Sequence, residues 1–349
     1  MSAGAFKTVG VVGSGSFGMA VANLLSYNTN VLVFTRKPEI VVAINEDHYY
    51  FNTPLSDKVR ATMDMEEIAS SCQVIFPVVP SVNFRAMMQN LSPFLHPSHI
   101  LIHGTKGFDI TGISDMDASN SVITRNNVHT MSEVILQESV VVRVGCMSGP
   151  NLSAEIISGQ PTASVIGSRF KEVTAVGQSV LQSKKFHVFG TYEILGAELA
   201  GALKNIIAIA SGILAGNGLG KNIQAMLINR GLTEMIHLGK AMGALSSKPF
   251  LGTAGIADLV ATATSTNSRN FTFGYRIGQG EKMDAILSTM PEQPEGVRTL
   301  KIARHLAKSY KLHVPIIQMV YSVVFHGFDI EKAITFLMEY PYAIDVDFI

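Results

Sequence analysis

One lysine lies in a segment that otherwise contains almost only apolar residues. In "GAELAGALKNIIAIASGILAG", residues 196–216, Lys204 precedes Asn205, and the residues three and four positions away along a helix carry no acid. Burial disfavours the charged form of a lysine side chain and makes proton exchange near neutral pH easier. Such a lysine suits general acid–base catalysis. The alternative is that the side chain extends to the surface.

A polar cluster further along the chain could bind a phosphate. In "TATSTNSRNFTFG", residues 262–274, Ser268, Arg269 and Asn270 combine a planar guanidinium with neutral donors. Helix capping is the alternative role for this serine and asparagine, and both roles can hold at once. Upstream, Asp258 in "GTAGIADLVAT" could orient the Lys204 ammonium, bind a substrate hydroxyl or cap the helix that follows.

The glycines near the start have the spacing of a dinucleotide-binding turn. Gly13, Gly15 and Gly18 fit G-x-G-x-x-G between an expected strand and an expected helix. The first glycine permits the tight turn, the second lets the backbone approach a pyrophosphate, and the third lets helix and strand pack closely. The start of the helix offers free N–H groups to phosphates. A turn that uses glycine only for backbone freedom is the disfavoured alternative.

The residue after the second expected strand indicates which nucleotide is accepted. NAD-selective sites usually place Asp or Glu about 20 residues beyond the glycines, but Arg36 stands here. A guanidinium can pair with a 2′-phosphate. We therefore expect NADP to be accepted, with NAD not excluded; a solvated Arg36 is the alternative.

Lys106 lies in a glycine-flanked loop after another expected strand. In parallel sheets such loops border the place where ligands bind. The alternative is that Lys106 is simply solvated, as most loop lysines are.

Short apolar runs alternate with amphipathic stretches in the first half of the chain. Strands are expected at 8–12, 31–34, 74–79, 100–103, 140–144, 163–166 and 186–189, and they predict a parallel sheet covered on both faces. After about residue 191 the pattern is helical, and there Arg230 and Glu234 are expected to form an ion pair. The fold class is therefore an α/β N-terminal Rossmann-like doubly wound sheet, residues 1–190, plus an all-α C-terminal domain, residues 191–349.

The composition excludes several classes of partner. The 349 residues are 47% hydrophobic and 15% charged, with no net charge and no dense basic block, so we expect no nucleic-acid partner. The apolar run 206–216 is too short to span a bilayer, and the start does not resemble a signal peptide. We expect a cytoplasmic protein without stable membrane insertion, without a metal site, and with Cys72 and Cys146 as buried thiols.

Taken together, the motifs resemble a known enzyme family along nearly the whole chain. In order, these are the glycine turn, "VPSVNFR" (79–85), "TKG" (105–107), "SGPN" (148–151), "GAELAGALKNIIAIASGI" (196–213), "AGIADLVAT" (254–262), "NSRNFTFG" (267–274) and "PEGV" (294–297). The sequence is similar to the NAD(P)-dependent glycerol-3-phosphate dehydrogenases, in particular the bacterial biosynthetic type.

The resemblance implies a reaction and a set of residues. The reaction is reversible NAD(P)H-dependent reduction of dihydroxyacetone phosphate to sn-glycerol 3-phosphate for glycerophospholipid synthesis, with Lys204 as the proton donor. The implied substrate-binding residues are Lys106, Gly149, Asn151, Asp258, Ser268, Arg269 and Asn270. The implied cofactor-binding residues are Gly13, Gly15, Ser16, Phe17, Gly18, Arg36, Lys106, Ser153, Arg269 and Glu295.

Some positions depart from the family's usual pattern. Ala257 replaces a glycine that commonly precedes the aspartate, and residues 151–153 read Asn-Leu-Ser where Ser/Thr-Phe-Ala is usual. Gln293 and Pro294 stand where apolar residues are common. These changes leave the charged residues of the family's pattern intact.

Two other functions are compatible with parts of the pattern. A related lysine-dependent two-domain reductase of a β-hydroxy acid or a ketoacid would share the Lys-Asn pair, and its substrate carboxylate would also satisfy an arginine. A non-catalytic dinucleotide sensor would need the glycine turn but not a solitary lysine in an apolar helix. The apolar helical half favours a homodimer.

Overall fold

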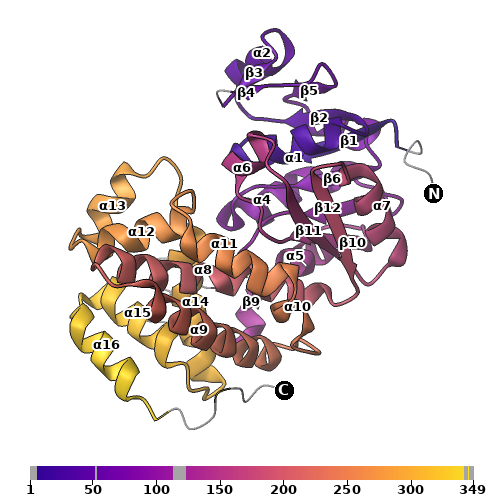
Figure 1. Ribbon diagram of the computed structural model, residues 1–349. Helices are drawn as coiled ribbons and strands as arrows, with labels where there is room; N and C mark the ends of the chain where they lie inside the picture. The colour runs from indigo at the N-terminus through magenta and orange to yellow at the C-terminus, as the bar shows by residue number, and fades with distance from the viewer. Residues whose placement is uncertain (1–5, 52, 113–122, 342–344, 346–349) are drawn as a thin grey trace. The chain divides into compact units, whose positions relative to one another are not determined.

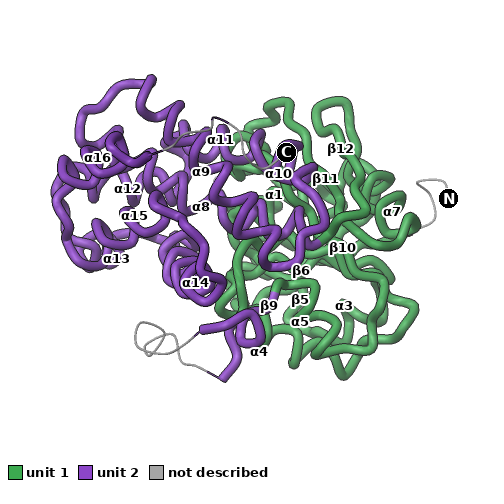
Figure 2. The backbone as a smooth tube through the Cα atoms, turned by 90° about the horizontal axis from the view of Figure 1, so that it is seen from below, with its two compact units in different colours: residues 1–109, 130–194 green, residues 110–129, 195–349 purple. Residues whose placement is uncertain are grey.

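The computed structural model describes residues 6–51, 53–112, 123–341 and 345 (Figure 1). The chain divides into two compact units (Figure 2). Unit 1 comprises Met1–Asp109 and Thr130–Ile194, and unit 2 comprises Ile110–His129 and Leu195–Ile349. The boundary expected at residue 190 falls inside β12 (Phe186–Thr191), the last strand of unit 1. The segment Ile110–His129 belongs with the helical unit, which the sequence did not predict.

Unit 1 is built on an eight-stranded sheet with the order β12-β11-β10-β7-β6-β1-β2-β5. The strands are β1 (Thr8–Val12), β2 (Asn30–Phe34), β5 (Val59–Thr62), β6 (Val74–Pro77), β7 (Ile100–His103), β10 (Arg143–Ser148), β11 (Thr162–Gly167) and β12 (Phe186–Thr191). Every neighbouring pair is parallel except β10 and β11. The expected Rossmann-like doubly wound sheet is confirmed.

Helices cover both faces of this sheet because alternate strand residues are apolar on both sides. Val9 and Val11 are fully buried in the core that α1 shares with α7, whereas a Cβ on the intervening Gly10 would lie 3.2 Å from Ile68 Cγ2 on α3. The helices of unit 1 are α1 (Ser16–Ser26), α2 (Pro38–Asn45), α3 (Met65–Ser71), α4 (Ser81–Leu91), α5 (Met131–Glu138), α6 (Ser153–Ile157) and α7 (Lys171–Leu181), with a 3-10 turn at Ser92–Phe94.

Three details of the sheet differ from expectation. The strand expected at 140–144 was wrong in its bounds, because Val140 and Val142 are each 55% exposed and the chain enters the sheet only at Arg143. Strand β11 runs antiparallel because the connection from β10 contains only the five-residue helix α6 and returns to the same end of the sheet. The edge strand β5 was not expected.

Unit 2 is helical. Its elements are α8 (Ile194–Gly216), α9 (Lys221–Ala241), α10 (Lys248–Leu251), a π-helical turn (Thr253–Ala257), α11 (Asp258–Thr264), α12 (Arg269–Gly278), α13 (Met283–Thr289), α14 (Glu295–Ser309), α15 (Pro315–His326) and α16 (Ile330–Glu339). The remaining short elements among the described residues are β3 (Tyr49–Tyr50), β4 (Thr53–Pro54), β8 (Asp109–Ile110), β9 (Val128–His129) and the 3-10 turn Arg125–Asn127. Among the described residues α8 alone is long and apolar enough to cross a membrane, but 89% of its apolar window is buried inside the protein, as in a core helix.

Helices α8 and α12 pack with their backbones in direct contact. A Cβ on Gly212 of α8 would lie 2.1 Å from the Phe271 carbonyl oxygen, and one on Gly274 of α12 would lie 2.0 Å from that of Ile209. Gly216 and Gly278 repeat the same contact one turn further on. Only glycine permits this approach. The contact fixes the helix that carries Lys204 against the helix that begins at Arg269.

The expected ion pair between Arg230 and Glu234 is wrong. The buried Glu234 carboxyl group accepts the backbone N–H groups of Ile316 at 2.6 Å and Ile317 at 3.0 Å, at the start of α15. Arg230 donates to the carbonyl of Asp345 at 2.8 Å. Free N–H groups at a helix start need acceptors, and the oxygens of this carboxyl group from α9 supply them here.

Candidate active site

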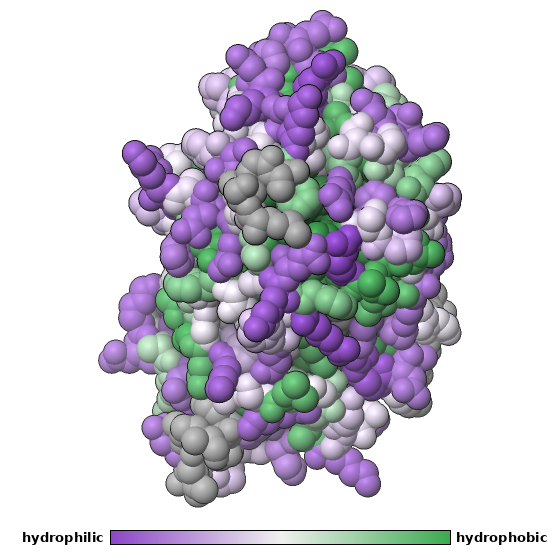
Figure 3. All heavy atoms as spheres, turned by 90° about the vertical axis from the view of Figure 1, so that its right-hand side faces the viewer, coloured by the Kyte–Doolittle hydropathy of each residue, from purple (hydrophilic) through white to green (hydrophobic). Residues whose placement is uncertain are grey.

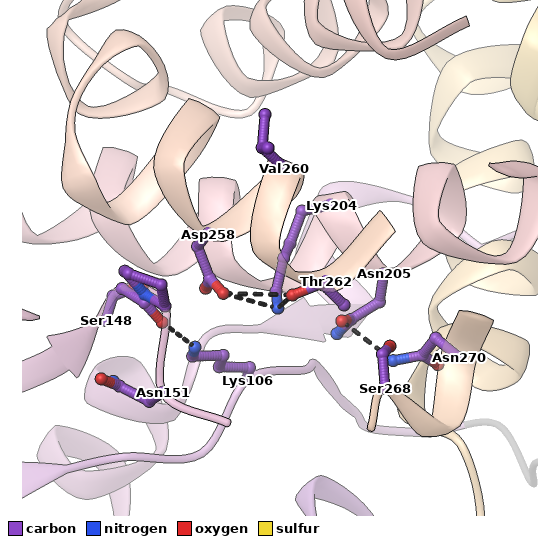
Figure 4. Close-up of polar contacts among 12 residues, drawn as sticks. Lys106, Ser148, Asn151, Lys204, Asn205, Asp258, Val260, Thr262, Ser268 and Asn270 are labelled. Atoms are coloured by element: carbon purple, nitrogen blue, oxygen red, sulfur yellow. Dashed lines mark hydrogen bonds and ion pairs between the residues drawn. The ribbon is translucent and has the colours of Figure 1, made fainter. Parts of the chain in front are cut away.

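The Lys204 side chain does not reach the surface, so the surface alternative is wrong. Lys204 is 5% exposed, and its Nζ donates to Asp258 Oδ1 at 2.8 Å and to the Thr262 hydroxyl (Figure 4). Thr262 in turn donates to Asp258 Oδ1 at 3.2 Å. Of the three roles considered for Asp258, the structure shows the first, orientation of the Lys204 ammonium. The carboxylate and hydroxyl hold the ammonium in one place inside the helical unit.

The chain forms this arrangement through a turn that only glycine permits. A Cβ on Gly255 would lie 1.9 Å from the Phe250 carbonyl oxygen, and the π-helical turn around it leads directly into Asp258. Asp258 and Thr262 are four residues apart on α11 and therefore share a face. Ala257 has φ −65° and ψ −45°, an ordinary helical conformation, so the departure from glycine at this position causes no backbone strain.

A second set of polar contacts joins the starts of α12 and α14 to α8. Asn270 Nδ2 donates to Asn205 Oδ1 at 3.0 Å, and Asn270 Oδ1 accepts the Gly296 N–H at 2.9 Å. A Cβ on Gly296 would lie 2.6 Å from Asn270 Oδ1, so the glycine of "PEGV" is needed for close approach. This chain of contacts places Asn270 beside the neighbour of Lys204.

The residues expected to bind a phosphate, Ser268 and Arg269, differ in what they contact. Ser268 is the N-cap of α12, and its hydroxyl accepts the Phe271 N–H at 3.2 Å, which is the capping alternative. Arg269 is 45% exposed at the side chain, and its guanidinium donates to the carboxylate of Glu292. The guanidinium is thus at the surface at the amino end of a ten-residue helix, a place that favours an anion.

In unit 1 the glycine turn has the geometry that the motif requires. Gly13 has φ +126°, and a Cβ there would lie 2.6 Å from the Val78 carbonyl oxygen. A Cβ on Gly18 would lie 1.9 Å from the Gly13 carbonyl oxygen. Gly15 is exposed at the N-cap of α1, and Ser16 and Phe17 follow in a first turn without acids. This end of α1 fits a pyrophosphate.

Two orphaned polar atoms near Lys106 also fit a ligand. Lys106 Nζ donates to the Gly149 carbonyl at 2.7 Å, and Gly149 has φ +139° (Figure 4). Asn151 Nδ2 donates to Ser164 Oγ at 3.2 Å, but Asn151 Oδ1 and Ser148 Oγ are buried without a hydrogen-bond partner among the described residues. Buried polar atoms are nearly always satisfied, so a ligand with hydroxyl or amide groups matches this position.

The structure distributes the expected site residues between the two units. Gly13, Gly15, Ser16, Phe17, Gly18, Arg36, Lys106, Gly149, Asn151 and Ser153 belong to unit 1, and Lys204, Asp258, Ser268, Arg269, Asn270 and Glu295 belong to unit 2. Arg36 is exposed two residues beyond the end of β2. Ser153 and Glu295 are the first residues of α6 and α14.

Sequence reasoning missed Thr262 and gave no role to Asn205. The signal for Thr262 was present, because it lies one helical turn after Asp258 and a hydroxyl there shares the face of the carboxylate. Asn205 could not be assigned, because its partner Asn270 lies 65 residues away and only the packing of α8 on α12 joins them.

Comparisons with known proteins agree along the chain. The N-terminus of NAD-dependent glycerol-3-phosphate dehydrogenase matches residues 8–174, and its C-terminus matches residues 193–335. A glycerol-3-phosphate dehydrogenase (NAD(P)+) from Teredinibacter turnerae is 36% identical over 97% of this chain and 96% of the relative. One from Staphylococcus aureus is 36% identical over 94% of this chain and 97% of its own length.

A solved structure has the same fold. The crystal structure of glycerol-3-phosphate dehydrogenase from Coxiella burnetii superposes with a TM-score of 0.85 at 28% identity, covering 96% of this chain and 99% of that one. A ketopantoate reductase from Ralstonia eutropha has a TM-score of 0.57 at 14% identity, which shows a shared fold alone. The chain belongs to the NAD-dependent glycerol-3-phosphate dehydrogenase family.

Proposed function

We propose that this chain catalyses the reversible NAD(P)H-dependent reduction of dihydroxyacetone phosphate to sn-glycerol 3-phosphate. The observation that carries the proposal is the buried Lys204 ammonium, held by Asp258 and Thr262 in a chain that also contains a complete dinucleotide turn. A dinucleotide sensor has no use for the first feature, whereas a reductase needs both. The product is a precursor of glycerophospholipids, which is the role we propose for the enzyme.

The Lys204 ammonium would donate its proton to the carbonyl oxygen in reduction and recover it from the hydroxyl in oxidation. A bound nicotinamide supplies or accepts the hydride. Asp258 stabilises the ammonium and fixes its direction, and the Thr262 hydroxyl prevents Nζ from turning aside. General acid–base catalysis of this kind contributes roughly 10²–10⁴-fold to the rate.

The remaining residues would bind and orient. We propose that Arg269 binds the substrate phosphate, with Asn270 and Ser268 shaping the start of α12 around it. Lys106, Gly149 and Asn151 would contact the substrate from the Rossmann-like unit. The dinucleotide would lie along Gly13, Gly15, Ser16, Phe17, Gly18 and Arg36, with Lys106, Ser153, Arg269 and Glu295 as further contacts.

A spectrophotometric assay tests this function. Oxidation of NADH and NADPH is followed by absorbance with dihydroxyacetone phosphate, with 2-ketoacids including ketopantoate, and without substrate. We expect oxidation with dihydroxyacetone phosphate alone. Oxidation with a ketoacid and none with dihydroxyacetone phosphate would instead support the related reductases, whose carboxylate substrates also suit an arginine.

We also propose that the enzyme is a cytoplasmic homodimer without membrane insertion. Cys72 and Cys146 are both buried and are not joined in a disulfide, which suits a reducing compartment. Burial raises the pKa of the Cys72 thiol to about 12, which leaves it unreactive.

Exposed apolar side chains support the proposed homodimer. Apolar residues reach the surface between polar ones on the face shown in Figure 3, and in unit 2 Phe336 and Met338 of α16 are 43% and 58% exposed. Light scattering coupled to gel filtration measures the molar mass and so the oligomeric state, and the mass of a monomer would contradict the dimer.

A further inference from the structure

Two hydroxyl groups join the glycine turn to the end of the second strand. Ser14, between the first two glycines, donates to Thr35 Oγ1 at 2.9 Å. Thr35 follows the last residue of β2 and is 3% exposed, and its own N–H donates to the Thr62 carbonyl at 3.0 Å. The Lys37 N–H also donates to Thr35 Oγ1, at 3.3 Å. The Thr35 side chain therefore has a fixed position at the edge of the dinucleotide turn.

These contacts leave one hydroxyl proton unused. A threonine hydroxyl has one proton to donate and two lone pairs, and Ser14 and Lys37 occupy both lone pairs of Thr35 Oγ1. Within the described part of the chain, neither hydroxyl of the Ser14–Thr35 pair has a further acceptor. The pair holds two protons and shares one hydrogen bond, so one proton remains available for a ligand.

The surroundings of that proton indicate an anionic acceptor. Thr35 is followed by Arg36 and Lys37, both exposed, and no carboxylate lies in the stretch Phe34, Thr35, Arg36, Lys37. In dinucleotide-binding folds this position faces the 2′ group of the adenosine ribose. We propose that Thr35, held by Ser14, is a specificity-determining residue that donates its hydroxyl proton to the 2′-phosphate of NADPH. The inference rests on the dinucleotide site of the proposed function.

NADPH and NADH should respond differently to loss of the Thr35 hydroxyl. A hydrogen bond to a charged oxygen contributes about 1.5–3 kcal/mol and one to a neutral oxygen about 0.5–1.5 kcal/mol. Loss of the Thr35 hydroxyl should thus weaken NADPH binding about 10- to 100-fold and NADH binding only a few-fold. A purely structural role in the turn would weaken both equally.

Calorimetric titration of the full chain measures the affinity for each cofactor and so tests the role of Thr35. The ligands are NADPH and NADH, together with 2′,5′-ADP and 5′-AMP as fragments that differ only in the 2′-phosphate. Thr35→Val removes the hydroxyl, and Thr35→Ser retains it. The matched control is Thr62→Val, at the end of the neighbouring strand β5, which removes a hydroxyl that accepts the Asp64 N–H at 3.0 Å. We expect only Thr35→Val to weaken NADPH and 2′,5′-ADP selectively.

Equal losses for both cofactors, or no loss, in Thr35→Val would overturn the proposal. If that variant does not fold, Ser14→Ala takes its place, because it frees Thr35 to rotate and should also weaken NADPH more than NADH. Equal effects of Ser14→Ala would again be contrary evidence. A wild-type chain that binds NADH but not NADPH would overturn the inference and leave the proposed function standing. Binding of neither cofactor would overturn the proposed function itself.

Discussion

Lys204 Nζ lies 2.8 Å from Asp258 Oδ1, and the two side chains are only 6% and 2% exposed. Removing both charges from water is costly, so such a pair is weak evidence for stability. Loss of one partner, however, leaves an uncompensated buried charge and destabilises a protein by about 3–5 kcal/mol. The pair is consistent with catalysis, and any test of Lys204 must separate lost chemistry from lost stability.

We predict that Lys204→Met lowers kcat by about 10²-fold or more, while NADH binding persists. The single variant should also be less stable, because Asp258 is left buried and charged. The double variant Lys204→Met/Asp258→Leu should recover stability in urea unfolding without recovering turnover. Turnover at the wild-type rate in either variant would remove Lys204 from the mechanism.

Thr262→Val should lower kcat about 10-fold or more, because it removes the hydroxyl that holds the Lys204 ammonium. Thr262→Ser retains that hydroxyl and should restore most of the rate. On the same helix, Thr264→Val removes an exposed hydroxyl that donates to the Val260 carbonyl, and steady-state kinetics should show no change in that variant. A loss of similar size in Thr264→Val would mean that α11 is generally sensitive to valine.

Glu292→Gln should lower the KM for dihydroxyacetone phosphate. The Glu292 carboxylate pairs with the Arg269 guanidinium and competes with the substrate phosphate that we assign to it. Both side chains are more than a third exposed, so the pair contributes less than about 1 kcal/mol and the change in KM should be at most about 5-fold, largest at low salt. Glu281→Gln, which removes the partner of Arg276, is the control. A raised KM in Glu292→Gln would show that Glu292 supports the site.

Glu234 should make stability depend on pH. Burial raises the pKa of its carboxyl from 4.5 to about 8, against the opposing effect of the Ile317 and Ile316 N–H groups. The folded state therefore binds this proton more tightly than the unfolded chain, and the contribution present at low pH is lost as pH rises from about 4.5 to 8. The slope approaches about 1.4 kcal/mol per pH unit.

Urea unfolding between pH 5 and 8 measures this slope in the wild type and in Glu234→Gln. The variant keeps a neutral acceptor at the start of α15, so its free energy of unfolding should fall less steeply with pH. Parallel curves for the two proteins would show that Glu234 does not titrate in this range.

The parts of the fold that could be predicted are those that local pattern decides. The glycine turn follows from its spacing, and Lys204 is conspicuous because its apolar neighbours require a buried partner. The parts that could not be predicted depend on long-range packing. Glu234 has a suitable partner one turn away in Arg230, yet the amides of α15, 82 and 83 residues further on, compete successfully for it. The contact between the Ser14 and Thr35 hydroxyls likewise forms only because β1 lies beside β2.

The glycine contacts between α8 and α12 fix the distance between these two helices. Two helices that touch backbone to backbone have no side-chain layer to compress, so they cannot slide when a ligand of different size arrives. The spacing between Lys204, which we propose as the proton donor, and Arg269, which we propose binds the substrate phosphate, is therefore set by the main chain. Selectivity for a short phosphorylated substrate would then be hard to alter by exchanging side chains in the pocket, and enlarging the accepted substrate would require separating the helices themselves.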